Sequence, residues 1–189
     1  MSGTILLGLL AVVLGYGIVI FNNLVAIKNN LAKSWSNIDV LLVQRHDEIP
    51  KLVEVCKQYM QFERDTLERV MRARAGANSA RAAGDVRGVG AAESDIRAGL
   101  GRISATVEAY PELKANQSLM QLMGRVTGLE NAIADRREFY NESAYLNNLR
   151  IERFPDLFVA RLFNFPRAHL LEFSAEDKAD PDVRALFRA

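Results

Sequence analysis

The sequence has few of the residues that build disulfide frameworks and metal sites. Its 189 residues include one cysteine, Cys56, and two histidines, His46 and His169. One thiol cannot form an intramolecular disulfide, and a structural zinc site needs several cysteine or histidine ligands. The composition therefore predicts neither a disulfide framework nor a bound metal.

The sequence also lacks a surplus of charge of either sign. Lys+Arg number 24 and Asp+Glu number 23, for a net charge of +1. Proteins that bind nucleic acid usually carry a basic surplus that neutralises phosphates, so nucleic acid is not an expected partner. Neither GxxxxGK[ST] nor GxGxxG occurs, and a nucleotide or other cofactor is therefore not expected.

No charged side chain precedes Lys28. Residues Thr4–Phe21 read TILLGLLAVVLGYGIVIF, and the apolar stretch extends to Val25. Eighteen helical residues span roughly 27 Å at 1.5 Å per residue, close to the ~30 Å hydrocarbon core of a bilayer. We interpret residues 1–25 as a transmembrane anchor and the lipid bilayer as a partner.

A buried core helix and a cleaved signal peptide are the alternatives for this segment. A signal peptide has a basic n-region and a small-x-small cleavage site. The leading MSGT has no Lys or Arg, and apolar Leu24, Val25 and Ile27 follow where a cleavage region is expected. A retained single-pass anchor is favoured. Because Lys28, Lys33 and Arg45 follow the span, the positive-inside rule predicts an outside N-terminus and a cytoplasmic domain.

The rest of the chain has the apolar spacing of long helices. Leu24, Ile27, Leu31, Trp35, Ile38 and Leu42 form one stripe, and no Gly or Pro lies between Phe21 and Ile49. The anchor is therefore expected to continue into the first soluble helix as one rod. Asp47 is an expected N-cap and Pro50 a first-turn residue, which predicts a turn or sharp kink near residues 46–50.

Further helices are expected along the chain. The predicted segments are 49–75, a third helix carrying Ile96 to Val107, a fourth from Leu119 to Ala144, and a short one at 157–162. The Ala-, Gly- and Ser-rich stretch Gly76–Ser94 predicts a long helix end followed by a mobile loop. Tyr110-Pro111 and Phe154-Pro155 are expected helix stops, because the residue before proline is disfavoured in the α region.

These stripes have near-heptad spacing, and helices of this length must pack on one another to bury them. The predicted fold is all-α, with a transmembrane helix continuing into an antiparallel bundle of about four long helices over residues 26–165. Residues 166–189 are expected to form an irregular C-terminal tail. The tail is either disordered or docks Val183, Leu186 and Phe187 on a neighbouring protein.

The cluster Arg45-His46-Asp47-Glu48 is the strongest candidate for chemistry. A histidine beside carboxylates can act as a general base or metal ligand. No HxxxH or HxxE pairing accompanies it, so a helix-turn cap is favoured and no catalytic residue is assigned. Mixed charges from Glu130 to Glu138, including Arg136 and Arg137, indicate a solvated helix face. Trp35, beside Asn37 and Asp39, is interpreted as a core residue rather than a recognition patch.

Several blocks of the sequence resemble the LemA family of bacterial membrane proteins. The blocks are FNNLVAIKNNLAKSWSNIDV at 21–40, RHDEIPKLVEVCKQY at 45–59, ERDTLERVMRAR at 63–74, EAYPELKAN at 108–116, RREFYNE at 136–142 and RFPDLFVARLF at 153–163. The resemblance covers nearly the whole chain after the anchor. The chain departs from the family at Leu146-Asn147, where a second Tyr-Asn pair is usual, and at Leu-Leu-Glu (170–172).

The resemblance implies a transmembrane helix, a long antiparallel bundle and no established enzymatic activity. Some relatives are associated with magnetosome membrane formation. We therefore expect a non-enzymatic, self-associating scaffold at the bacterial inner membrane, with an adaptor or signalling subunit of an envelope complex, binding partners through the tail, as the alternative. The signature residues are Trp35, Asn37, Asp39, Arg45, His46, Asp47, Pro50, Tyr110, Pro111, Tyr140, Asn141, Phe154 and Pro155.

Overall fold

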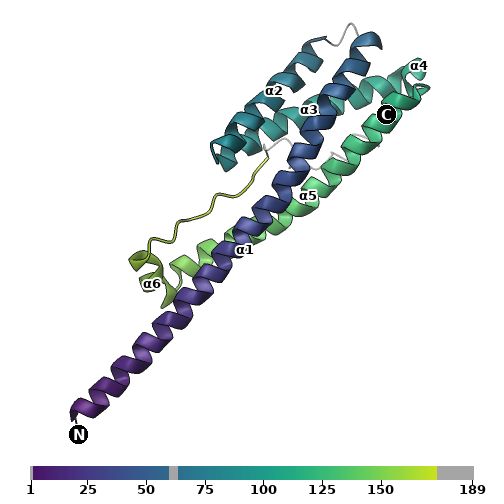
Figure 1. The fold of residues 1–189 in the computed structure, drawn as a ribbon. Helices are drawn as coiled ribbons and strands as arrows, with labels where there is room; N and C mark the ends of the chain where they lie inside the picture. Colours follow the sequence, from purple (N-terminus) through teal and green to yellow (C-terminus); the bar gives the residue numbers. More distant parts are fainter. Residues whose placement is uncertain (1, 60–63, 174–189) are drawn as a thin grey trace, which may run out of the picture. The chain divides into compact units, whose positions relative to one another are not determined.

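The computed structural model describes residues 2–59 and 64–173. In this part of the chain every regular element is a helix, and no strand occurs. The helices are α1 (Ser2–Tyr59), α2 (Arg64–Ala82), α3 (Val86–Ala109), α4 (Pro111–Lys114), α5 (Gln117–Glu152) and α6 (Asp156–Leu162), shown in Figure 1. The predicted all-α fold with long helices is confirmed.

The chain forms two compact units. The first comprises the residues up to Val40 together with Ile133–Leu170, and the second comprises Leu41–Ala132 and the segment that begins at Leu171. In the first unit α1 and α5 run antiparallel, because Trp35 meets Tyr140 whereas Ile20 and Leu24 meet Ile151. In the second unit α2 and α3 are antiparallel, because Val70 lies at Gly99 and Gly76 lies near Ala92.

Each unit buries its own apolar cluster. The first unit packs Ile20 and Leu24 of α1 against Ile151 and Ala160. The second unit has the larger core, drawn from all of its helices: Ile49, Leu52, Val53, Cys56, Leu67, Val70, Ala77, Ile96, Leu100, Ile103, Val107, Leu113, Leu119 and Val126. These residues recur at intervals of three and four, which is the spacing that places side chains on one helix face.

The N-terminal part of α1 is an apolar helix whose side chains are not buried. Leu6, Val12 and Ile18 are 70%, 72% and 60% exposed. The helix is long and apolar enough to cross a membrane, a criterion of length and composition that signal sequences also meet. Its exposure argues against a core helix, because a core helix buries its apolar side chains.

The predicted turn near residues 46–50 is wrong, and so is the predicted N-cap at Asp47. α1 continues as one helix of 58 residues with Pro50 inside it. Proline cannot donate to the carbonyl four residues earlier, which here belongs to His46. Arg74 of α2 fills that gap, since its Nε donates to the His46 carbonyl oxygen at 2.6 Å. A side chain from another helix thus satisfies the acceptor that the proline leaves open.

The helix end predicted at the start of Gly76–Ser94 is present, but the mobile loop predicted after it is wrong. α2 extends to Ala82 and α3 begins at Val86. A short turn joins them, with Gly84 at φ +68° and the Asp85 carboxylate accepting from the Gly88 amide at 3.0 Å. The small residues serve the contact between the two helices, because short side chains let backbones approach closely.

The start of the C-terminal tail is irregular but held by side chains of α5. Asn147 Nδ2 donates to the Pro166 carbonyl at 3.2 Å, and Tyr140 Oη donates to the His169 carbonyl at 2.8 Å. Asn148 forms a pair of hydrogen bonds with the Ala168 backbone, at 2.8 and 2.9 Å. These bonds replace the regular backbone pairing that the segment lacks. Val183, Leu186 and Phe187 lie outside the described residues.

The last described residues pack on α3 of the second unit, where Leu171 and Phe173 are buried. A Cβ added at Gly90 would lie 2.2 Å from the carbonyl oxygen of Glu172, which is backbone and has little room to move. We expect Gly90→Ala to displace this segment, at a cost of about 1–3 kcal/mol.

Gly101→Ala is the matched control, since a Cβ there meets nothing within 4 Å. It should stabilise α3 by up to ~1 kcal/mol, because alanine is the better helix former. Chemical denaturation of the full chain in detergent, followed by circular dichroism, measures both variants. Equal unfolding free energies for the two would contradict the close packing at Gly90.

Candidate functional site

Two polar residues occupy the apolar stripe of α1 in the second unit. Arg45 and His46 fall between Leu42 and Ile49, at the spacing of three and four that faces the core. They are 3% and 2% exposed. A buried charge is costly unless it is paired and hydrogen-bonded. The partners of these two side chains therefore decide what this part of the core can do.

Glu93 of α3 is the common partner of both residues. Its carboxylate forms an ion pair with the Arg45 guanidinium, and its Oε1 lies 2.9 Å from His46 Nε2. Glu93 is 1% exposed. Glu130 of α5 adds a second acid, 3.6 Å from Arg45 Nη1. Charges from three helices thus meet around one arginine.

Residues of α2 complete the surroundings of His46. Asn78 Oδ1 lies 2.9 Å from His46 Nδ1 and also accepts from Arg81 Nη1 at 3.3 Å. Arg74 binds the His46 backbone carbonyl. We call Arg45, His46, Asn78, Glu93 and Glu130 the buried polar cluster. It joins α1, α2, α3 and α5 through side chains alone.

Burial sets the ionisation of this cluster. It lowers the pKa of His46 to about 4, against an opposing effect of the hydrogen bond to Asn78. Burial also lowers the pKa of Arg45 to about 10, partly offset by the charge of Glu130. At neutral pH Arg45 is therefore charged and His46 is neutral. A neutral ring has one N–H, and when this proton is on Nε2 it is donated to Glu93 Oε1.

The arrangement is suited to holding helices together. His46 and Glu93 have the relative placement of an acid–base pair, but both are closed off from solvent. Burial raises the pKa of the Cys56 thiol to about 11, so this cysteine stays protonated and is a poor nucleophile. Over residues 2–59 and 64–173, no three His, Cys, Asp or Glu side chains are grouped to hold a metal ion.

The interpretation of Arg45-His46-Asp47-Glu48 as a helix-turn cap is not what the structure shows. These residues lie within α1, and only the first two enter the buried polar cluster. Asp47 is exposed, and Glu48 contacts Lys51 at 2.9 Å. The acid that meets the histidine comes from α3 and not from the adjacent sequence.

The other signature residues are distributed over both units. Trp35 is half-buried and its ring lies 5.4 Å from that of Tyr140, which holds the tail as described above. Tyr110 caps the junction of α3 and α4, where Pro111 is the first helical residue. The peptide bond between Phe154 and Pro155 is cis. Asn37 is exposed, whereas Asp39 and Asn141 are partly buried.

Sequence reasoning missed Glu93, Asn78 and the role of Glu130. Glu93 and Asn78 fell inside the stretch predicted as a helix end and a mobile loop, and Glu130 was assigned to a solvated face. One signal was available for Glu93. Extending the apolar stripe of α3 backwards gives Val89, Glu93 and Ile96, which places the acid on the buried face.

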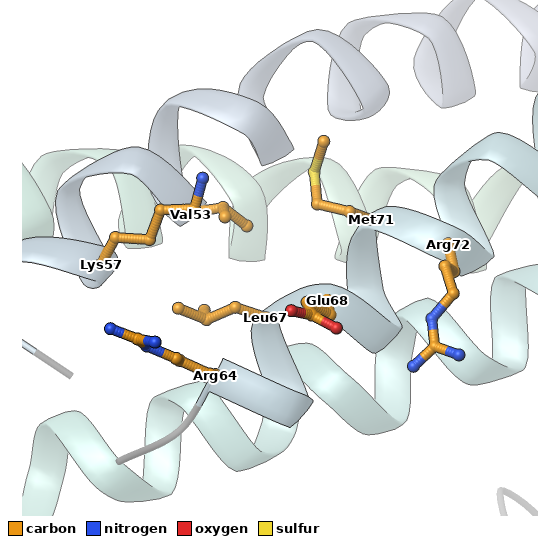
Figure 2. A pocket seen from close by; sticks show the side chains of 7 residues that line it. All are labelled: Val53, Lys57, Arg64, Leu67, Glu68, Met71 and Arg72. Carbon is orange, nitrogen blue, oxygen red and sulfur yellow. The ribbon is translucent and has the colours of Figure 1, made fainter. Parts of the chain in front are cut away.

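A separate cavity of about 590 Å³ lies between the end of α1 and the start of α2. Val53, Leu67 and Met71 form its apolar part, as Figure 2 shows. Lys57, Arg64 and Arg72 place three cations around it, with Glu68 as the acid among them. This combination of apolar surface and positive charge is suited to an acidic, partly apolar group.

The chain is similar to several magnetosome proteins. It is 34% identical over 73 residues to magnetosome proteins MamQ 2 and MamQ 1 of Paramagnetospirillum magneticum, covering 39% of this chain and 27% of each relative. It is 34% identical over 68 residues to magnetosome protein MamQ of Magnetospirillum gryphiswaldense, covering 36% of this chain and 25% of the relative. The chain thus matches less than a third of the length of these relatives. Residues 34–184 match the family described as LemA family, and the protein belongs to the LemA family.

Proposed function

We propose that this protein is a membrane-anchored, non-enzymatic scaffold that self-associates at the bilayer surface. The observation that carries the proposal is the row of exposed apolar side chains on residues 4–19 of α1. A surface of that kind is unfavourable in water and favourable in lipid. The closed buried polar cluster supports a structural rather than a catalytic role for the core.

The proposed orientation follows from the charges after the span. Lys28, Lys33 and Arg45 favour a cytoplasmic soluble part and an outside N-terminus at the bacterial inner membrane. Protease added to sealed inside-out and right-side-out vesicles tests this orientation. Digestion of the soluble part only in inside-out vesicles is expected, and digestion only in right-side-out vesicles would reverse the proposed topology.

Self-association is supported by apolar side chains on the outer face of α5. Phe139, Tyr145, Leu146 and Leu149 are exposed. We call these four residues the α5 patch. Contiguous apolar patches on soluble surfaces commonly mark interaction sites. The proposed partner is a second copy of this chain, since closed homo-oligomers are the commonest assemblies.

We expect a mass above that of the monomer when the protein is extracted in mild detergent. Phe139→Ser combined with Leu146→Ser should shift the population to monomers, because it removes apolar contacts from the α5 patch. Gln121→Ser is the matched control, an exposed residue of the same helix that lies 18 residues before Phe139 and outside the α5 patch. Mass photometry over a range of concentrations measures all three, and a wild-type monomer throughout would refute the scaffold proposal.

An adaptor role in a larger envelope complex is the alternative. The cationic, partly apolar cavity of Figure 2 favours it, because an acidic amphipathic helix of another protein would match its chemistry. Charge reversal at Lys57 and Arg64 would then release that partner while leaving self-association intact. A scaffold without such a partner would be unaffected by the charge reversal.

A further inference from the structure

The turn after α5 and the short helix α6 present apolar side chains to the outside of the first unit. Phe154, Phe158 and Leu162 are 75%, 65% and 75% exposed. Phe158 and Leu162 are four residues apart and share one face of α6, and Phe154 lies in the turn before that helix. The rings of Phe154 and Phe158 meet edge to face at 5.9 Å. We call these three residues the α6 tip.

Contacts with α1 fix where the α6 tip lies along that helix. Ala160 of α6 and Ile151 of α5 pack on Ile20 and Leu24. Just beyond α6, the rings of Phe163 and Phe165 lie 4.7 and 5.9 Å from the ring of Phe21. Apart from the partly buried Gly17, residues 4–19 of α1 are exposed, whereas Ile20 is buried and Phe21 partly buried. The α6 tip therefore lies at the level where the exposed apolar segment ends.

The charged residues around the α6 tip leave cations on the surface. Arg153 and Arg161 are exposed. The two acids of the same stretch are both in ion pairs, Asp156 with Arg150 at 2.6 Å and Glu152 with Arg167 at 3.2 Å. Exposed aromatic side chains beside arginines are the composition of segments that lie in the membrane interface.

We propose that the α6 tip inserts Phe154, Phe158 and Leu162 into the interface of the leaflet at the C-terminal end of the apolar span. Arg153 and Arg161 then contact lipid phosphates while their stems lie along the acyl boundary. The proposal rests on the proposed membrane anchor. It gives the first unit two points of contact with the bilayer, which restrict the tilt and rotation of α1 as interfacial anchors do.

The charge and position of the tip favour lipid over a second copy of the chain as its occupant. The tip continues the apolar surface of α1, and that surface is itself the proposed span. The α5 patch, by contrast, extends from Leu149 near the end of α5 back to Phe139, which is its residue farthest from the tip. Phe139 is 13 residues before the end of α5 at Glu152, which corresponds to about 20 Å of helix.

Tryptophan fluorescence in vesicles tests the proposal on the full chain. Phe158→Trp is made in protein reconstituted into vesicles of phosphatidylcholine with 20 to 30% phosphatidylglycerol (roughly the anionic content that attracts basic segments). Acyl chains brominated near the headgroup then quench any indole in the interface. We expect severalfold stronger quenching of Phe158→Trp than of Phe139→Trp. Native Trp35 lies about 21 Å along α1 from Phe21. Its fluorescence, measured in the wild-type protein, is subtracted as background from that of each variant.

Two further variants separate the possible failures. Tyr16→Trp, within the exposed apolar segment, reports whether the span is in the bilayer. Quenching of Tyr16→Trp without quenching of Phe158→Trp would overturn the insertion of the tip and leave the anchor standing. Absence of quenching at Tyr16→Trp would overturn the anchor itself. Leu162→Trp repeats the test at a second exposed position, in case Phe158→Trp perturbs α6.

Two other outcomes of the fluorescence experiment would contradict the insertion of the α6 tip. Blue-shifted emission from Phe158→Trp without quenching by brominated lipid would mean that a second copy or another protein covers the tip, which contradicts the proposal. Equal quenching at residues 158 and 139 would contradict the assigned depth. Quenching at residues 16, 158 and 162 but not at 139 is the expected pattern.

Discussion

We expect Glu93→Ala to destabilise the second unit by about 3–5 kcal/mol, because it leaves the buried Arg45 charge without its closest partner. Glu93 also accepts from His46, so the same change removes two partners from one core. Chemical denaturation of the full chain in detergent, followed by circular dichroism, gives the unfolding free energy. The expected loss is a large fraction of the stability of an ordinary domain.

Two comparisons show whether the loss comes from the charge pair. Asp95→Ala changes an exposed acid on the same helix and should alter the unfolding free energy by less than about 0.5 kcal/mol. Replacing both charges, with Arg45→Met and Glu93→Leu, should recover much of the stability, because an apolar pair removes the uncompensated charge. A loss at Glu93→Ala no larger than that at Asp95→Ala would refute the role assigned to the buried polar cluster.

We expect the protein to lose stability as the pH falls from about 6.5 to about 4. The pKa of His46 is about 4 in the folded protein and 6.5 in its ordinary state. Between these values the unfolded chain binds a proton that the folded chain does not, so acid favours unfolding. A shift of this size corresponds to roughly 3 kcal/mol, fully lost below the folded pKa.

The charged groups that face His46 contribute to the lowering of its pKa and thus to the loss of stability in acid. Arg45, Arg74 and Arg81 are cations that oppose a charge on the ring, in addition to burial. Glu93 is the acid that faces it. His46→Gln keeps a donor toward Glu93 but cannot titrate, and it should flatten the dependence of unfolding free energy on pH over this range.

His169→Gln is the matched control for the other histidine of the chain. His169 is exposed and is held through its backbone carbonyl, so its replacement should leave the pH dependence unchanged. Denaturation at about pH 7.5, 6, 5 and 3.5, values that bracket the two pKa values, measures the slope for each variant. An unchanged slope in His46→Gln would place the acid sensitivity elsewhere in the protein.

Local patterns were sufficient to predict most helices. The stripe from Ile96 to Val107 predicted α3, and the stripe from Leu119 to Ala144 predicted α5. The stop at Tyr110-Pro111 was found because proline restricts the residue before it. These predictions succeeded because a spacing of three and four residues is a property of one segment and does not depend on the neighbouring helices.

The predictions that failed all depended on contacts between helices. Pro50 signalled a helix start, but Arg74 supplies the hydrogen bond that lets α1 continue. Gly76 and its small neighbours signalled a loop, yet small residues are also what closely packed helices need. Nothing in a single sequence distinguishes these two uses of glycine and alanine.

The sequence by itself determined that this protein has a long exposed apolar helix and a set of amphipathic helices, because both are properties of consecutive residues. Only the tertiary structure decided which charges meet. Arg45 and His46 were visible as polar residues on an apolar stripe, but Glu93 lies 47 residues beyond His46 and reaches it across the core. Likewise nothing in the sequence around Phe154 and Phe158 indicates where they lie. The packing of Ala160 on α1 places them beside the end of the apolar segment. Pairing across helices depends on three-dimensional position, which no local spacing specifies.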